Sequence, residues 1–206
     1  IRAATVALAS DTGSSDHDGL SNDASLVFST LQSDASRVIK IDGSSVSNYN
    51  PASLADGHHV VSITDTDLAG NTSSASVSFT LDTSADKGQS LAISFADGVI
   101  TSEEKAAVAF SVAGVDADVN EVDATVTFTD ELGTSVTVLA SAGSADLSSL
   151  FDGEISVVLA VKDAAGNTAQ TAASLTADTV APTINSSDTA TAIDENSGAG
   201  QVVYTV

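Results

Sequence analysis

The chain has 206 residues and carries 28 acidic against 6 basic side chains, which gives a formal net charge of −22. This length is too great for one ordinary immunoglobulin-sized domain and suits two modules of about 100 residues. Because phosphate backbones and anionic lipids repel so acidic a chain, we expect it to bind neither nucleic acid nor a membrane surface. Because 42% of the residues are apolar, the chain can nevertheless bury a core.

Cysteine is absent, which excludes disulfides, zinc–thiolate sites and a thiol nucleophile. No apolar run approaches the roughly 20 residues that a membrane-spanning helix needs, so we expect no membrane insertion. Both ends of the sequence fall within strand-like patterns, and we therefore expect a fragment of a longer protein. A small extracellular domain without disulfides needs another stabilising element, for which a bound metal ion is the obvious candidate.

Alternation of apolar and polar residues predicts strands that bury one face. In chain order, the buried positions of these strands are Val77, Phe79 and Leu81; Val108, Phe110 and Val112; Val122, Ala124, Val126 and Phe128; and Ile155, Val157, Leu159 and Val161. Residues 103–110 could also form a helix, but the alternation favours a strand that begins near Ala107. A single helical turn is expected before each Asp-Gly pair, at residues 51–55 and 145–151.

The sequence repeats itself, since residues 56–85 align without a gap to residues 152–181. Short strands separated by turn residues predict an all-β chain of tandem immunoglobulin-like antiparallel β-sandwich modules. Module one covers residues 1–85, module two covers residues 86–181, and residues 182–206 open an incomplete third module. The linkers DTSADK and DTVAPT contain no Gly/Ser run, so they are expected to be short and stiff.

Acidic residues gather in the loops and linkers of this predicted fold. The candidates for metal binding are Asp11, Asp16, Asp18 and Asp23 in the first loop; Asp82 and Asp86 in the first linker; Asp97 and Glu103, Asp116, Asp118 and Glu121, and Asp163 in module two; and Asp178 in the second linker. Asp163 and its counterpart Asp67 begin the two D-x-A-G-N turns. The first loop resembles an EF-hand only loosely, because it lacks a Glu at the twelfth position.

Sandwich geometry predicts where these acids meet. The first loop of such a module lies at its C-terminal end, whereas the loops after the second and sixth strands lie at its N-terminal end. Asp11–Asp23 should therefore face Asp82 and Asp86, with 116–121 and Asp163 beyond them. At the next junction, Asp97 and Glu103 should face Asp178 and the start of module three. Converging carboxylates repel each other unless a cation neutralises them, and Ca²⁺ takes six to eight oxygen ligands. Several structural calcium ions are therefore expected at the junctions, with Mg²⁺ less suited.

Two other interpretations of the acids remain open. Asp in a turn commonly caps backbone N–H groups, and each D-x-A-G-N turn is open to that interpretation. An acidic surface can also serve solubility alone.

The runs DTGSSDHDGLSND, SITDTDLAGNTSSASVSFTLDTSA, DGVITSEE and VKDAAGNTAQTAASLTADTVAPT resemble the bacterial Ig-like repeats of giant RTX-type adhesins, over residues 1–183. The resemblance implies a calcium-rigidified extender that projects adhesive domains from the bacterial surface for adhesion or biofilm formation. The implied calcium ligands are Asp11, Asp18, Asp23, Asp82, Asp97, Glu103 and Asp178. Module two departs from the pattern, because SFADG stands where module one has DTGSSDHDG. The implied partners are neighbouring modules of one long monomeric, extracellular chain.

The tail AIDENSGAGQVVYTV resembles the opening of a cadherin-like domain, which implies that Glu195 is a calcium ligand beside the second linker. An enzyme is not expected, because no catalytic motif occurs and aromatic platforms for a sugar are scarce. His58 and His59 should point to opposite faces of a strand, and His17 is expected at the surface. The alternative function is recognition of a glycan, peptide or partner adhesin through residues 42–56, where Tyr49 and Asn50 lie.

Overall fold

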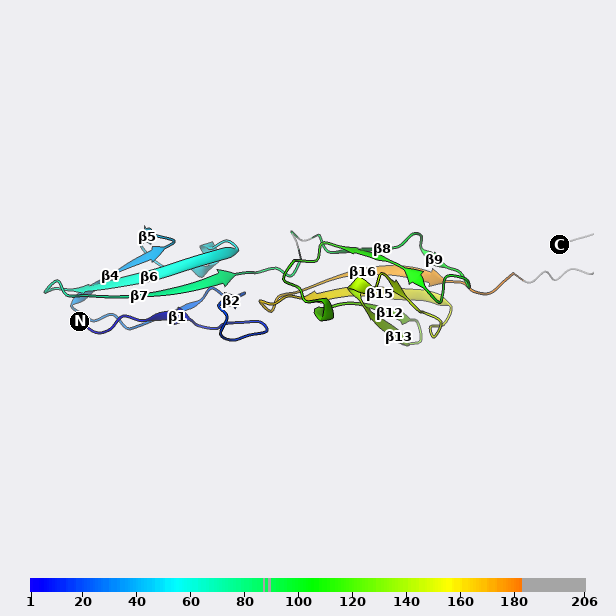
Figure 1. The fold of residues 1–206 in the computed structure, drawn as a ribbon, viewed down its shortest axis with the longest axis horizontal. Helices are drawn as coiled ribbons and strands as arrows, with labels where there is room; N and C mark the ends of the chain where they lie inside the picture. Colours follow the sequence, from blue (N-terminus) through cyan, green and yellow to red (C-terminus); the bar gives the residue numbers. More distant parts are fainter. Residues whose placement is uncertain (87, 89, 183–206) are drawn as a thin grey trace, which may run out of the picture.

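The computed structural model describes residues 1–182 apart from residues 87 and 89. It shows two β-sandwiches that follow one another along the long axis (Figure 1), without an α-helix in the described ranges. The prediction of an all-β, immunoglobulin-like sandwich fold is therefore confirmed. No helix within those ranges is long and apolar enough to cross a membrane. Residues 183–206, with Glu195 and nearly all of the expected third module, lie outside the described residues.

Module one is built from a five-stranded sheet in the order β2-β7-β6-β4-β5 and a facing pair, β1-β3. Its strands are β1 (Val6–Leu8), β2 (Leu20–Ser21), β3 (Leu26–Phe28), β4 (Ala35–Ile41), β5 (Ser44–Val46), β6 (Gly57–Asp67) and β7 (Thr72–Leu81). The short helix η1 (Pro51–Ser53) supplies the helical turn expected before the first Asp-Gly pair. The long β6–β7 hairpin forms the centre of this sheet and leads directly into the linker.

The core of module one contains the inward side chains of β6 and β7. Val61 and Phe79 are buried between the sheets, and Leu81 closes the core near the linker. At the opposite end, Arg37 of β4 forms a bidentate ion pair with the buried Asp65 of β6, with 2.7 Å from Nε to Oδ1 and from Nη2 to Oδ2. This end of the module therefore holds an ion pair where an apolar contact would otherwise lie.

Module two has the same plan, with a five-stranded sheet in the order β13-β12-β15-β16-β9 and the pairs β8-β11 and β10-β14. Its strands are β8 (Ala92–Ser94), β9 (Val99–Ile100), β10 (Val108–Ala109), β11 (Ser111–Ala113), β12 (Ala124–Asp130), β13 (Ser135–Leu139), β14 (Ser144–Ala145), β15 (Gly153–Lys162) and β16 (Thr168–Ala177). The short helices η2 (Glu121–Asp123) and η3 (Ala140–Ala142) precede β12 and β14. The β15–β16 hairpin corresponds to β6–β7.

Most of the alternation read from the sequence is reproduced in module two. Val126 and Phe128 of β12 and Ile155, Val157 and Leu159 of β15 are fully buried. The face assigned to Val122 is wrong, because this residue lies in η2 and its side chain is 71% exposed. The ladder with β15 begins only at Ala124, so the chain before that point is free to turn outward.

The helical turn expected at residues 145–151 does not form as a helix. Ala145 belongs to β14, and the following residues make a turn in which the Leu150 N–H donates to the Leu147 carbonyl oxygen at 3.0 Å. Leu147 and Leu150 are both buried, so packing of these two side chains fixes the turn.

Each module also contains one short parallel pair, which departs from a purely antiparallel sandwich. β2 runs parallel to the end of β7, and β9 runs parallel to the end of β16. Through these pairs the first loop of each module reaches the C-terminal end, where the chain leaves for the next linker (Figure 1).

Candidate metal centre at the module junction

The linker between the modules is held by hydrogen bonds along its length. The Asp82 N–H donates to the Ser21 carbonyl oxygen at 3.1 Å, which extends the β2–β7 pairing by one step. The Ser84 N–H donates to Asp82 Oδ1 at 3.1 Å, and the Ser84 hydroxyl donates to Asp86 at 2.8 Å. Ala85 is 1% exposed and packs into the core of module two. The linker therefore leaves module one in a defined direction.

A second carboxylate anchors the linker from the side. Asp56 precedes β6, and its Oδ1 accepts hydrogen bonds from the Thr83 N–H at 3.1 Å and from the Thr83 hydroxyl at 2.8 Å. The same pair of bonds recurs in module two, where Asp152 accepts from the Thr179 N–H and hydroxyl at 2.9 and 2.6 Å. All four residues are identical between the aligned copies, which indicates that the Asp-Gly turn anchors each linker.

Three carboxylates from separate segments lie together at this junction. Asp82 belongs to the linker, Asp118 to the loop between β11 and η2, and Asp163 to the turn after β15. One oxygen of each lies within 4.8 Å of an oxygen of the other two. These residues are named the junction carboxylates below.

Burial makes this arrangement electrostatically costly. Asp163 is 3% exposed, and both carboxylate oxygens of Asp118 are buried without a hydrogen-bond donor. Two unit charges 4.8 Å apart repel by about 3–4 kcal/mol at an effective dielectric constant of about 20. Burial and, after it, the neighbouring charges of Asp118 and Asp163 together raise the pKa of the Asp82 carboxyl to about 6, against the hydrogen bond from the Ser84 N–H, which lowers it.

Asp163 is oriented by the turn that it begins. Its Oδ1 accepts the Asn167 N–H at 2.7 Å and its Oδ2 accepts the Asn167 side-chain amide at 2.6 Å. The same amide donates to the Asp82 carbonyl oxygen at 2.9 Å, so Asn167 joins the turn to the linker. Sequence analysis did not assign Asn167 a role, although its identity with Asn71 in the aligned copy was the available signal. Asp67 and Asn71 form the same two bonds, both at 2.8 Å.

The donor set has the chemistry of a hard-cation site. Three carboxylates supply oxygen ligands, and the two oxygens of Asp118 have no competing donor. Such oxygens suit Ca²⁺, which accepts flexible coordination by carboxylates, carbonyls and water. The residues present therefore fit the calcium ion expected from the sequence.

The first-loop acids do not join the three junction carboxylates. Asp11 Oδ2 accepts the Gly19 N–H at 2.9 Å, whereas its Oδ1 is buried without a partner. Asp16 is exposed beside the ring of His17. Asp18 and Asp23 cap nearby backbone groups, accepting the N–H of the residue two positions ahead at 3.0 and 2.9 Å. The hydrogen bonds to Ser25 lower the pKa of Asp23.

The other predicted junction acids in the linker and module two also have local partners. Asp86 Oδ1 accepts the Ser84 hydroxyl at 2.8 Å, and Asp116 Oδ1 accepts the Ala117 N–H at 2.7 Å. Glu121 accepts the Ser141 hydroxyl at 2.5 Å. These three residues lie near the junction in sequence, but they are not among the carboxylates that converge.

The acids expected at the second junction lie at the C-terminal end of module two. The Asp178 N–H donates to the Ile100 carbonyl oxygen at 3.0 Å, as Asp82 does to Ser21 at the first junction. Asp97 caps the Val99 N–H at 3.1 Å, and Glu103 is exposed in the turn after β9. Among the described residues these acids form no cluster comparable to the junction carboxylates.

The loop considered for ligand recognition is occupied by internal contacts. The Tyr49 hydroxyl donates to the Ala24 carbonyl oxygen, and its ring packs edge-on against Phe28 with 5.7 Å between centroids. Burial raises the pKa of Tyr49 to about 12. Asn50 caps η1 by accepting the Ala52 N–H at 3.3 Å. The aromatic side chain of the segment considered for recognition is thus partly buried and packs against the core of module one.

The histidines have separate partners. His58 lies 2.8 Å from the Ser78 hydroxyl, whereas His59 lies 2.9 Å from Asp42 and 2.8 Å from the Ala55 carbonyl oxygen. Since their partners differ, the two rings do not converge on one metal ion or nucleophile. The bond to the Ala55 carbonyl is the main cause that raises the pKa of His59.

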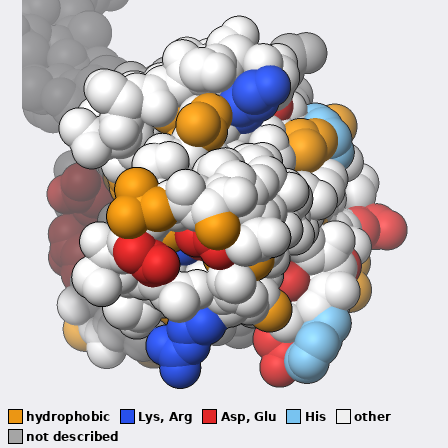
Figure 2. Space-filling view, turned by 90° about the vertical axis from the view of Figure 1, so that its left-hand side faces the viewer, with side chains coloured by type: hydrophobic (Ala, Val, Ile, Leu, Met, Phe, Trp, Pro, Cys, Tyr) orange, Lys and Arg blue, Asp and Glu red, His pale blue; other side chains and the backbone are white. Residues whose placement is uncertain are grey.

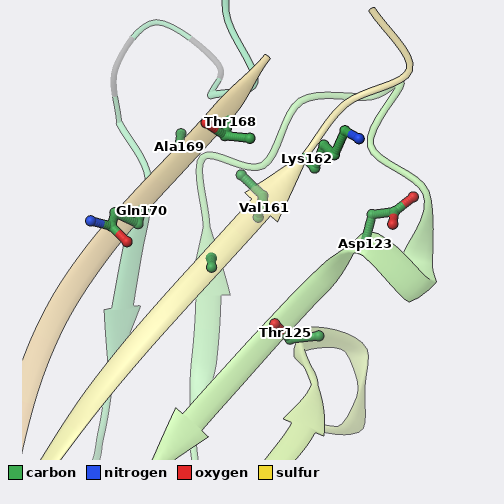
Figure 3. Close-up of a pocket in the computed structure, with 8 residues that line it drawn as sticks. Asp123, Thr125, Val161, Lys162, Thr168, Ala169 and Gln170 are labelled. Atoms are coloured by element: carbon green, nitrogen blue, oxygen red, sulfur yellow. The ribbon is translucent and has the colours of Figure 1, made fainter. Parts of the chain in front are cut away.

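One hollow of the surface lies on the outer face of module two. This hollow of about 520 Å³ lies against β12, β15 and β16; Figure 3 shows Thr168 and Gln170 on β16, Lys162 at the end of β15, and Asp123 and Thr125 on the side of β12. None of its lining residues is aromatic. At the end of module one away from the linker, hydrophobic side chains are scattered over the surface, and acidic groups occur in several separate places (Figure 2).

Three solved structures of adhesins are similar to the chain. The first is a tetra-tandem repeat in the extending region of a large adhesion protein, with a TM-score of 0.39 and 25% identity over 85% of this chain and 49% of that one. The second is a 1.5-MDa bacterial ice-binding adhesin, with a TM-score of 0.39 and 26% identity over 86% of this chain and 65% of that one. The third is a Ca²⁺-stabilized adhesin of an Antarctic bacterium, with a TM-score of 0.40 and 26% identity over 92% of this chain and 51% of that one. The chain thus spans about half to two thirds of their length.

The sequence itself gives one family match. No curated protein matches the chain significantly. Residues 1–83, which are almost the whole of module one, match the family described as bacterial Ig-like domain.

Proposed function

We propose that the chain is a calcium-rigidified extender segment of a bacterial cell-surface adhesin, with no enzymatic activity of its own. Its role is mechanical, because tandem sandwiches joined by short linkers hold adhesive domains away from the cell. The metal ion would be held by the junction carboxylates, with further ions in the first loop and at the second junction. The family match of module one and the internal repeat support this role.

The observation that carries the proposal is the junction carboxylate set. Three acids from the linker and two loops converge, and the oxygens of Asp118 are buried without any donor. A divalent cation would supply the missing partner and cancel the repulsion, and it would tie the linker to module two. Extracellular calcium modules bind at about 10⁻⁴–10⁻³ M, so calcium outside a cell would fill such a site and cytosolic calcium would not.

The test is a calcium titration of the full chain, followed by calorimetry and thermal melting. We expect Ca²⁺ to raise the melting temperature at millimolar concentration, whereas Mg²⁺ at the same concentration gives a smaller rise. Binding that stabilises only the folded state raises stability by about 2.7 kcal/mol at a ligand concentration of 100 Kd. A melting temperature that calcium leaves unchanged would refute the proposal.

A matched pair of variants assigns the effect to the junction. Asp82→Asn removes one junction carboxylate, whereas Asp146→Asn removes an acid that only caps the Ser148 N–H at 2.9 Å. The first variant should lose most of the calcium response of the junction and the second should keep it. Equal responses in both variants would place the bound calcium elsewhere.

A further inference from the structure

Module one touches module two directly, through a backbone N–H and a hydroxyl that both donate to backbone carbonyl oxygens of module two. The Ser14 N–H donates to the Ala164 carbonyl oxygen at 3.0 Å, and the Thr12 hydroxyl donates to the Ala165 carbonyl oxygen at 2.8 Å. Both acceptors belong to the D-A-A-G-N turn of module two. In Figure 1 the loop before β2 reaches the tip of the β15–β16 hairpin.

A glycine on each side makes this approach possible. Gly13 has a φ of +96°, and a Cβ atom built on it would lie 2.0 Å from the Ala164 carbonyl oxygen. Gly166 has a φ of +95°, and its Cβ would lie 3.1 Å from the Cα of Gly13. The two backbones therefore meet more closely than any pair of side-chain-bearing residues could.

The loop that makes the contact is held to the rest of module one by hydrogen bonds. The Thr12 hydroxyl accepts the Asn22 N–H at 2.8 Å while it donates to module two. Ser21 is fully buried, and its hydroxyl lies within hydrogen-bond distance of the carbonyl oxygens of Ser10 and Asp23, at 3.2 and 3.0 Å. Displacement of residues 12–14 would disturb these hydrogen bonds, so a shift of the loop at the contact would also move the part of module one to which it is bonded.

From these contacts we infer that residues 12–14 and 164–166 form a metal-independent docking contact that sets the angle between the two modules. The inference deepens the proposed extender role and rests on it. The junction carboxylates and their ion then govern how tightly the angle is held, whereas the docking contact governs its mean value. Module two has no counterpart of this loop, because SFADG replaces DTGSSDHDG.

The test is pulsed electron–electron double resonance, which measures the distance between two spin labels, here attached to the full chain at Ser45→Cys and Gln170→Cys. The natural chain contains no cysteine, so both labels attach specifically. Gly13→Ala and Gly166→Ala are the test variants. Gly70→Ala is the matched control, because Gly70 occupies the equivalent turn of module one with a φ of +86° and no atom within 4 Å of the added Cβ.

We expect Gly13→Ala to shift the mean distance between the labels, with calcium and with EGTA alike. The clash requires a retreat of at least about 1 Å at the contact to reach ordinary packing distance, and the lever arm to the labels enlarges it. Gly166→Ala should produce a smaller shift, and Gly70→Ala none. Circular dichroism melts check that each variant folds, and Gly166→Ala remains informative if Gly13→Ala unfolds module one.

The inference is overturned if neither junction variant moves the mean distance beyond the Gly70→Ala control. This outcome is separate from failure of the calcium proposal, which is read from the parent chain. There, calcium should narrow the distance distribution, and an unchanged width would count against the role of the ion without touching the docking contact.

Discussion

Replacement of Asp118 by Asn separates the two opposite effects that a buried acid has at a metal site. The substitution keeps the shape of the side chain but removes the negative charge of a carboxylate whose two buried oxygens accept no hydrogen bond. Without calcium, module two should become more stable, because repulsion among the junction carboxylates falls. With calcium, the variant should gain less than the parent chain, because one anionic ligand is missing.

The size of the stability change can be worked out from the pKa of Asp82, which the charge of Asp118 raises. A rise in the pKa of Asp82 from 3.8 to about 6 corresponds to about 3 kcal/mol at neutral pH, shared between burial and the charges of Asp118 and Asp163. Asp118 contributes part of this energy, and each 1 kcal/mol that its replacement releases raises the melting temperature of a domain of about 100 residues by about 4–8 °C.

Differential scanning calorimetry in EGTA and in calcium measures both effects. Asp123→Asn is the control, since Asp123 is an exposed acid near the same loop and outside the junction carboxylates. A lower melting temperature of Asp118→Asn in EGTA would refute the account of repulsion. An undiminished calcium response would refute Asp118 as a ligand.

Three further predictions concern pH, the ion pair and the linker anchor. Because the pKa of Asp82 is raised in the folded state, the calcium-free fold binds more protons than the unfolded chain and loses stability as pH rises from about 4 to about 6. Calcium competes with the proton on Asp82. Titration calorimetry should therefore find that calcium binds about tenfold more weakly at pH 5 than at pH 7. Arg37→Leu leaves Asp65 buried and unpaired, which should cost module one about 3–5 kcal/mol in a calorimetric melt, and the double variant Arg37→Leu/Asp65→Leu should recover part of it. Asp56→Ala removes both bonds to Thr83 and should broaden the distance distribution between the two labels, whereas Asp146→Ala should not.

The strands could be predicted because burial on one face of a sheet leaves a period of two in the sequence. Phe79 in β7 and Val157 in β15 show this pattern and are buried. The pattern does not show where the ladder of hydrogen bonds stops, which explains the error at Val122. The turn at Leu147 and Leu150 was misread for a related reason, because a short apolar run suits a buried turn as well as a helical one.

The convergence of acids could be predicted only as a region. Asp116 and Asp118 are two residues apart, and nothing in the sequence separates them. In the structure Asp116 turns back to cap the Ala117 N–H, whereas Asp118 faces Asp82 and Asp163. The contact of Gly13 with the Ala164 carbonyl oxygen left no side-chain signal at all, because backbone atoms make it.

The distribution of charge connects the proposed ion with the docking contact. The outer faces of the central sheets carry hydroxyl pairs such as Thr64–Ser74 and Thr127–Thr137, at 2.9 Å each. Asp82 lies where module one ends, whereas Asp118 and Asp163 lie on the facing end of module two, so repulsion between Asp82 and the other two opposes a close approach of the modules. The hydrogen bonds of residues 12–14 require the same ends to stay close. A cation bound between the carboxylates removes this conflict, and the angle defined by the backbone contact can then persist under load.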